Sequence, residues 1–95
     1  MPPAARKGDI TTGHGCFDSV PIISSSNDVT INNIPAARET DAVAAHTCGD
    51  STHDSLVSLG SGTVKVNGLS LARVGDPTTC GDVIARGSGN VIVGA

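Results

Sequence analysis

The chain has 95 residues, a formal net charge of −3 and a single aromatic residue, Phe17. Its length limits it to one domain over residues 1–95, and its six Lys and Arg residues are scattered singly, which argues against a basic face that binds nucleic acid. No apolar run approaches the roughly 20 residues that span a bilayer, and no apolar segment of a Sec-type signal peptide follows Arg6 and Lys7.

A domain this small, with almost no aromatic side chains, has a thin core. Such domains often depend on a disulfide, a metal ion or an oligomer for stability. The chain offers three Cys and three His residues for this purpose. Because an odd number of Cys leaves at least one outside any intramolecular disulfide set, the composition favours a metal ligand or free thiols over a disulfide framework.

A short phrase occurs three times along the chain. The residues Pro-Ala-Ala-Arg stand at positions 3–6 and again at 35–38, and a degraded copy, Ser-Leu-Ala-Arg, stands at 70–73. Each copy is followed by an Asp three residues after its Arg: the pairs are Arg6 with Asp9, Arg38 with Asp41, and Arg73 with Asp76. We expect each Arg to bond to its Asp or to nearby turn carbonyls and so to brace a corner of the fold, and we do not interpret the pairs as catalytic acid and base groups.

Short β-branched segments with alternating polarity occur at 29–31, 64–66 and 91–93, each after a turn of small residues. Asn32-Asn33 and Asn67-Gly68 then supply two-residue hairpin turns, because Asn and Gly tolerate a positive φ. We therefore predict hairpins that pair 28–31 with 34–37 and 63–66 with 69–72. One face of these strands should be apolar (Val29, Ile31, Val64, Val66, Val91, Val93) and the other should carry Thr30, Lys65 and Ile92.

The third copy lacks its second half, because the chain ends at residue 95, whereas the first Pro-Ala-Ala-Arg lies at the N-terminus. An unpaired strand edge is a liability, so we predict that the C-terminal strand pairs with the N-terminal one. The result would be an all-β fold of three hairpin-like units with pseudo-threefold symmetry. Residues 40–45 are rich in Ala, but Gly and Thr nearby make a long helix unfavourable, so we predict a loop or a single turn there.

Potential metal ligands follow each copy of the phrase. His14 and His46 lie five residues after their Asp, and Cys80 lies four residues after Asp76. If the repeats are related by rotation, these side chains converge near the axis, and His53 is the fourth candidate. Three imidazoles and one thiolate suit tetrahedral Zn²⁺ better than iron or copper. No nucleophile motif is present, and Ser61 and Ser88 are interpreted as turn residues.

The two remaining cysteines leave alternatives open. Cys16 and Cys48 each lie two residues after a candidate ligand, His14 and His46. Cys48 could replace His53 as a ligand, the two could be spare thiols that pack as small apolar residues, or they could form a disulfide near the axis. We favour spare thiols.

Taken together, these strings resemble PAAR-repeat proteins. The resemblance rests on the two literal Pro-Ala-Ala-Arg strings, on Gly-Asp at 8–9 and 75–76, on Thr-Gly-His-Gly at 12–15, on Val-Asn-Gly at 66–68 and on the turn at 87–91. It implies a small β-rich cone with zinc near its apex, held by His14, His46, His53 and Cys80. The chain departs from the family pattern with Glu39-Thr40 in place of Val-Gly, with Ser-Leu-Ala-Arg in the third copy, and with His46 where relatives often carry Cys.

The resemblance also implies a function. PAAR-repeat proteins are non-enzymatic tips that cap the trimeric β-helical spike of type VI secretion systems or contractile phage tails. We expect one monomer to bind the blunt end of a spike through its broad end and to contact the target membrane transiently. Effector proteins would be carried as separate chains, since no fused effector domain is expected here. It would be cytoplasmic before firing and then secreted or injected without a signal peptide, or be part of a virion tail.

Two other functions compete with this one. A small zinc hydrolase would need an open metal position and a nearby base, but four ligands are available and the only Glu, Glu39, lies at an Arg–Asp corner. A metal-stapled adhesion or capping module unrelated to secretion is the third possibility.

Overall fold

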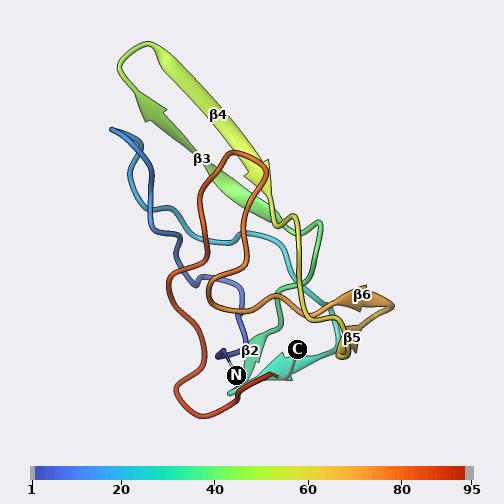
Figure 1. Cartoon of the computed structure of the whole chain (residues 1–95). Helices are drawn as coiled ribbons and strands as arrows, with labels where there is room; N and C mark the ends of the chain where they lie inside the picture. Colours follow the sequence, from blue (N-terminus) through green and yellow to red (C-terminus); the bar gives the residue numbers. More distant parts are fainter. Residues whose placement is uncertain (1, 94–95) are drawn as a thin grey trace.

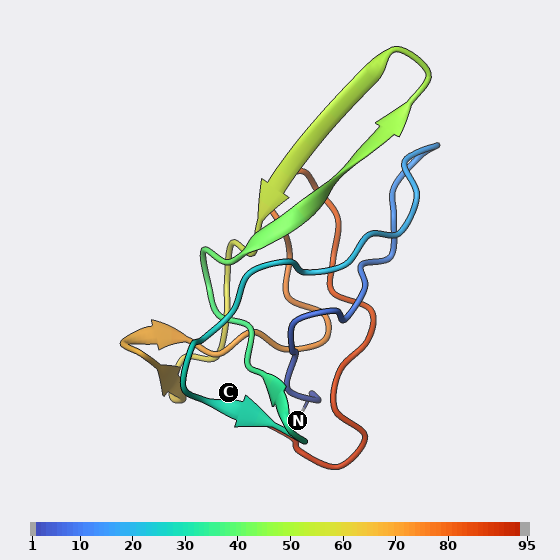
Figure 2. The same ribbon diagram turned by 180° about the vertical axis from the view of Figure 1, so that it is seen from behind.

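The computed structural model describes residues 2–93, and its strands form three antiparallel pairs with no helix. The strands are β1 (Thr30–Ile31), β2 (Ile34–Pro35), β3 (Ala42–Cys48), β4 (Ser51–Leu56), β5 (Lys65–Val66) and β6 (Leu69–Ser70). Strands β3 and β4 project from the narrow end of the molecule, while β1–β2, β5–β6 and both ends of the described chain lie at the broad end (Figure 1; Figure 2 shows the reverse side). The all-β prediction is therefore confirmed. Within this described part, nothing qualifies as a membrane-spanning helix.

The two predicted hairpins are confirmed, although their ladders are shorter than expected. Strand β1 pairs with β2 and β5 pairs with β6, and each ladder contains two residue pairs. Asn32 and Asn33 have φ of 56° and 66°, and Asn67 and Gly68 have φ of 54° and 80°. These positive values at both central positions are those of the turn whose twist matches a β-hairpin.

The expectation of a loop or single turn over residues 40–45 is wrong, because most of this segment belongs to β3. Strand β3 pairs with β4 in a long hairpin whose register shifts between Val43 and His46, and Gly49 supplies a positive φ of 60° at its turn. Ala has the highest helix propensity of the common residues, but helix propensity is a weak preference that tertiary contacts readily override. Pairing with β4 and the burial of Val43 in the core outweigh that preference.

The same backbone hydrogen bonds recur in all three copies of the repeated phrase and join them in a ring. The amide of Ala37 donates to the carbonyl of Ala5 (3.1 Å), that of Ala72 donates to Ala37 (3.0 Å), and that of Ala5 donates to Ala72 (2.9 Å). All three Ala side chains are fully buried. Because three backbones meet here, a small side chain is needed at each position. Around them lies one core cluster with Ile22, Val57 and Ile84, and a second cluster contains Ile31, Val66 and Val93.

The predicted pairing of the two ends of the chain is confirmed within residues 2–93. The amide of Ala4 donates to the carbonyl of Val91 (2.9 Å), and the amide of Val93 donates to the carbonyl of Pro2 (2.8 Å). The other two units contain the bond equivalent to the first of these, from Ala36 to Val29 and from Leu71 to Val64. The N-terminal segment thus supplies the strand that the third copy lacks.

The three Arg–Asp pairs are confirmed as braces. Each Asp carboxylate accepts two guanidinium hydrogen bonds and the backbone N–H of its own Arg; for Arg38 and Asp41 these distances are 3.0, 2.9 and 2.7 Å. The corresponding bonds join Arg6 to Asp9 and Arg73 to Asp76. The acidic residues are buried, so each ion pair closes a corner in a stiff, bidentate geometry.

Thr40 has a left-handed backbone conformation that a residue with a Cβ disfavours. The residue just before the buried Asp has a positive φ in all three corners: 93° at Gly8, 78° at Thr40 and 94° at Gly75. A left-handed conformation costs a residue with a Cβ about 1–2 kcal/mol. We expect Thr40→Gly to raise the free energy of unfolding by about 1 kcal/mol, after the greater chain entropy of Gly is subtracted.

Urea unfolding of the wild type and of Thr40→Gly measures this change in stability. Thr40→Ala, which keeps a Cβ, is the matched control, and its free energy of unfolding should rise much less. The reciprocal substitution Gly75→Thr should be destabilising. Equal stability of wild type and Thr40→Gly would show that the φ of Thr40 carries no strain.

Candidate metal centre

Three separate segments bring the four predicted ligands together near the end from which β3 and β4 project. His14 begins a tight turn in which its N–H donates to the carbonyl of Phe17 (3.0 Å) and Phe17 donates back to His14 (2.9 Å). His46 on β3 and His53 on β4 are direct cross-strand partners. Cys80 lies on a third loop, closed by the bridge between Pro77 and Val83.

The four ligand atoms surround a single point. All lie within 4.8 Å of one another. The Nε2 atom of His53 is 3.2 Å from that of His14 and 2.7 Å from that of His46, and the Sγ of Cys80 is 3.9 Å from the Nε2 of His46. For metal–nitrogen bonds near 2.0–2.1 Å, the nitrogens of a tetrahedron are about 3.3 Å apart. The spacing therefore fits one metal ion.

The hydrogen bonding of His46 selects the tautomer that a metal needs. Its Nδ1 lies 2.8 Å from the carbonyl oxygen of Asp18. Because a carbonyl can only accept, Nδ1 carries the proton and Nε2 presents its lone pair toward the cluster. Such an outer hydrogen bond is typical of ligating histidines. The same carbonyl raises the pKa of His46, an effect that burial partly opposes.

Phe17 orients the imidazoles. Its ring centroid lies 4.9, 4.8 and 4.2 Å from those of His14, His46 and His53. The only aromatic residue of the chain thus packs against all three rings and covers one side of the cluster. Sequence reasoning missed this role, although the position of Phe17 three residues after His14 was visible.

Cys80 is prepared to act as a thiolate. Burial raises the pKa of its thiol, but hydrogen bonds from Thr78 and Ser55, among others, outweigh burial and lower the pKa to about 6. The Oγ1 atom of Thr78 lies 3.3 Å from the sulfur. A thiolate is the form of Cys that binds metals.

This shift predicts a pH dependence for the metal-free protein. The folded-state pKa of the Cys80 thiol is below the ordinary thiol value near 8.5. The stabilising contribution of the thiolate is therefore fully present above about pH 8.5 and is lost as the pH falls through about 6. We expect the free energy of unfolding, relative to that of Cys80→Ser, to rise from pH 6 to 8.5. Urea unfolding of both proteins in the presence of a chelator measures this difference in stability. Parallel pH profiles of the two proteins would contradict the prediction.

Asp82 is a buried carboxylate beside the cluster that sequence reasoning also missed. Asp82 is 1% exposed. Its Oδ1 accepts hydrogen bonds from the Thr12 hydroxyl (2.7 Å) and the Val83 amide (3.0 Å). Its Oδ2 has no hydrogen-bond partner among the described residues. Burial raises its pKa, but the polar groups around it, among them the hydroxyls of Thr11 and Thr12, lower the pKa overall. A divalent ion held by three neutral imidazoles and one thiolate has a net charge of about +1, which the Asp82 carboxylate would offset.

The two remaining cysteines are joined. Cys16 and Cys48 form a disulfide with a Cα–Cα distance of 5.5 Å, which is typical of such bonds. The interpretation as spare thiols is therefore wrong, and the disulfide alternative is confirmed. Cys48 is not part of the His/Cys group, and Cys80 is a free cysteine.

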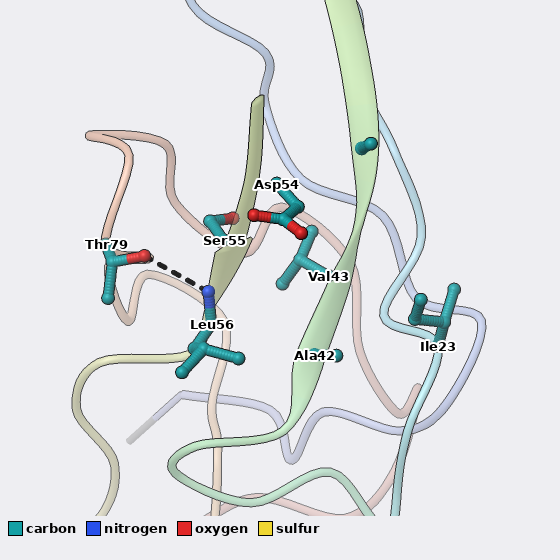
Figure 3. A pocket seen from close by; sticks show the side chains of 8 residues that line it. Ile23, Ala42, Val43, Asp54, Ser55, Leu56 and Thr79 are labelled. Atoms are coloured by element: carbon teal, nitrogen blue, oxygen red, sulfur yellow. Dashed lines mark hydrogen bonds between the residues drawn. The ribbon is translucent and has the colours of Figure 1, made fainter. Parts of the chain in front are cut away.

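An open hollow of about 590 Å³ lies beside β3 and β4 and is distinct from the metal cluster. It contains no His or Cys among its lining residues, which are Ile23, Ala42, Val43, Ala45, Asp54, Ser55, Leu56 and Thr79. Figure 3 shows its mainly apolar wall and the hydrogen bond from the Leu56 amide to the Thr79 hydroxyl (3.1 Å). The Asp54 carboxylate is its one charged group.

Comparison with known proteins identifies the family. The family model of the PAAR motif matches residues 18–86, which is most of the chain. The chain belongs to the PAAR-motif family. A search of the curated proteins found no match. In this PAAR protein the matched region contains His46, His53 and Cys80 but begins after His14, so His14 joins the site on the evidence of its geometry.

Proposed function

We propose that this PAAR protein is a non-enzymatic tip that caps the trimeric β-helical spike of a type VI secretion system or a contractile phage tail. The observation that carries the proposal, together with the family, is a threefold repetition at the broad end. Ser26, Ser61 and Ser88 are buried, and their hydroxyls accept the backbone N–H of Val29, Val64 and Val91 at 3.0, 3.0 and 2.8 Å.

This repetition places three similar apolar side chains on the surface. Val29, Val64 and Val91 are 36%, 37% and 37% exposed, whereas Ile31, Val66 and Val93, two residues further on, are buried. A monomer with three equivalent patches can make three similar contacts with a trimer. The partly exposed valines therefore support binding of the broad end to a trimeric spike. The spike would be loaded in the cytoplasm, and effector proteins would attach as separate chains.

The metal ion is proposed to be Zn²⁺, with a structural role. His14, His46, His53 and Cys80 supply four protein ligands, and a complete tetrahedral set leaves no position for a catalytic water. Zinc holds the three ligand-bearing segments together and so stiffens the narrow end, which would meet the target envelope first. X-ray absorption of the zinc-loaded protein should find three nitrogen ligands and one sulfur. A water oxygen in place of the sulfur would contradict the structural role and favour a zinc hydrolase.

Binding to the cognate β-helical spike, truncated to its trimeric tip, tests the proposed function. Val64→Glu places a charge in one of the three apolar patches, and it should weaken binding on the order of tenfold, because a buried unpaired charge is costly at an interface. Ile23→Glu is the matched control, since Ile23 is also a β-branched apolar residue, is 50% exposed and lines the hollow beside β3 and β4. Absence of binding by the wild type, or equal weakening by both variants, would contradict the proposal.

A further inference from the structure

The disulfide joins the turn that carries His14 to the hairpin that carries His46 and His53. Cys16 lies in the tight turn between His14 and Phe17, and Cys48 ends β3, next to the turn that leads into β4. The two cysteines are separated by 32 residues in the sequence. Each stands two residues after a metal ligand. The bond therefore connects the segment that holds His14 to the hairpin that holds His46 and His53.

Without this bond, side-chain contacts hold the turn around His14 to the hairpin. The rings of His14 and Phe17 pack against the imidazoles of His46 and His53, and the Nδ1 of His46 is hydrogen-bonded to the carbonyl of Asp18. The turn contributes one ligand to the metal and the hairpin contributes two. Movement of this turn away from the hairpin is therefore a direct way for the cluster to open.

Cys16 is exposed and Cys48 is half-buried, so small thiols and disulfides can reach the bond. We propose that Cys16 and Cys48 are a redox-dependent latch on the metal centre: a dithiol under reducing conditions and a disulfide under oxidising ones. Closing the latch strengthens metal binding. The inference rests on the metal centre of the proposed function but not on attachment to a spike.

The latch closes by exchange with a small-molecule disulfide such as oxidised glutathione. The thiolate of one cysteine attacks a sulfur of the oxidant, which releases one glutathione thiolate and forms a mixed disulfide. The second cysteine thiolate then attacks the protein sulfur of that mixed disulfide and displaces the second glutathione. Two electrons pass from the two cysteines to the oxidant, and their two protons end on the released glutathione thiols.

The coupling between the latch and the metal must be reciprocal. A covalent tether keeps His14 close to the other ligands after it dissociates, so that rebinding is favoured by a high effective concentration. If the disulfide tightens zinc binding by some factor, zinc must shift the thiol–disulfide equilibrium of the pair toward the disulfide by the same factor. The two quantities can be measured independently.

The experiment compares zinc-loaded protein equilibrated in oxidised and in reduced glutathione. Zinc is loaded first, so that Cys80 is held by the metal. Alkylation and mass spectrometry report the state of Cys16 and Cys48, and competition with a chelating dye gives the zinc affinity. We expect the disulfide form to bind zinc on the order of tenfold more tightly or better, and zinc to shift the glutathione equilibrium by the same factor.

The matched control is the double variant Cys16→Ser/Cys48→Ser, which cannot close the latch and should bind zinc equally in both buffers. Three outcomes would overturn the latch while leaving spike capping intact. The two wild-type forms could bind zinc with equal affinity, the dithiol form could bind it more tightly, or Cys16 and Cys48 could remain free thiols in oxidised glutathione. Failure of the protein to hold zinc in either buffer would overturn the latch together with the proposed metal centre. Failure to bind the spike would leave the latch unaffected.

Discussion

His53→Ala is expected to abolish stoichiometric zinc binding and to remove most of the stability that the metal provides. Structural zinc sites contribute on the order of 10 kcal/mol of apparent folding free energy at neutral pH. The His53 imidazole lies between those of His14 and His46, at 3.2 and 2.7 Å between Nε2 atoms. Its loss removes one of four ligands and leaves an open coordination position. We therefore expect the zinc-loaded wild type to exceed the variant by several kcal/mol in its free energy of unfolding.

Two comparisons separate this effect from ordinary packing loss. In the presence of a chelator, wild type and His53→Ala should differ by only about 1 kcal/mol, as is usual for a half-buried polar side chain. Thr52→Ala is the matched control, because Thr52 is the exposed neighbour of His53 on β4 and should retain one equivalent of zinc. Metal analysis and urea unfolding give both quantities. A His53→Ala protein that keeps one zinc and its full stability would remove His53 from the site.

Arg38→Met is expected to lower the free energy of unfolding by about 3 kcal/mol, which is the lower end of the cost of breaking a buried ion pair. The Asp41 side chain is 4% exposed and that of Arg38 is 19% exposed. The substitution leaves a buried carboxylate with the Ser24 hydroxyl (3.1 Å) and the backbone N–H of residue 38 (2.7 Å) as partners. These bonds do not replace the lost cation, while partial exposure of the guanidinium moderates the loss.

A double-mutant cycle distinguishes the ion pair from other contributions of Arg38. Asp41→Asn keeps an acceptor for the backbone N–H but removes the charge, so Arg38→Met/Asp41→Asn should be more stable than the sum of the single changes predicts. Arg86→Met is the matched control, since Arg86 is exposed and belongs to none of the three ion pairs at the corners. It should change stability by less than about 0.5 kcal/mol. Additive single changes would show that the pair is not coupled.

The parts of the structure that follow from local chemistry could be predicted from the sequence. Asn32-Asn33 and Asn67-Gly68 favour hairpin turns by their own conformational preferences, and the structure contains both turns. Arg38 reaches Asp41 because the two lie three residues apart at a corner. The repeated phrase supplied the register that singled out His14, His46 and Cys80 as neighbours. These features depend on short spans of chain or on repetition, and both are visible in one sequence.

Long-range partners could not be predicted in the same way. Strand β3 has Ala residues that favour a helix locally, and it forms a strand because β4 pairs with it and the core buries Val43. The role of Phe17 depends on three imidazoles meeting at its ring. The role of Asp82 depends on its burial against Thr12, a residue 70 positions away in the sequence.

The amino-acid sequence by itself determined the all-β class, the two short hairpins and the Arg–Asp corners, because each follows from a repeat or a local spacing. The same repeat singled out His14, His46 and Cys80 as candidate ligands, whereas His53 lies outside its register. Only the tertiary structure decided that Cys16 and Cys48 are joined and that Cys48 lies outside the metal site. The physical reason is distance: two cysteines 32 residues apart can bond only when the fold brings their Cα atoms to 5.5 Å, and no property of either residue alone specifies that approach.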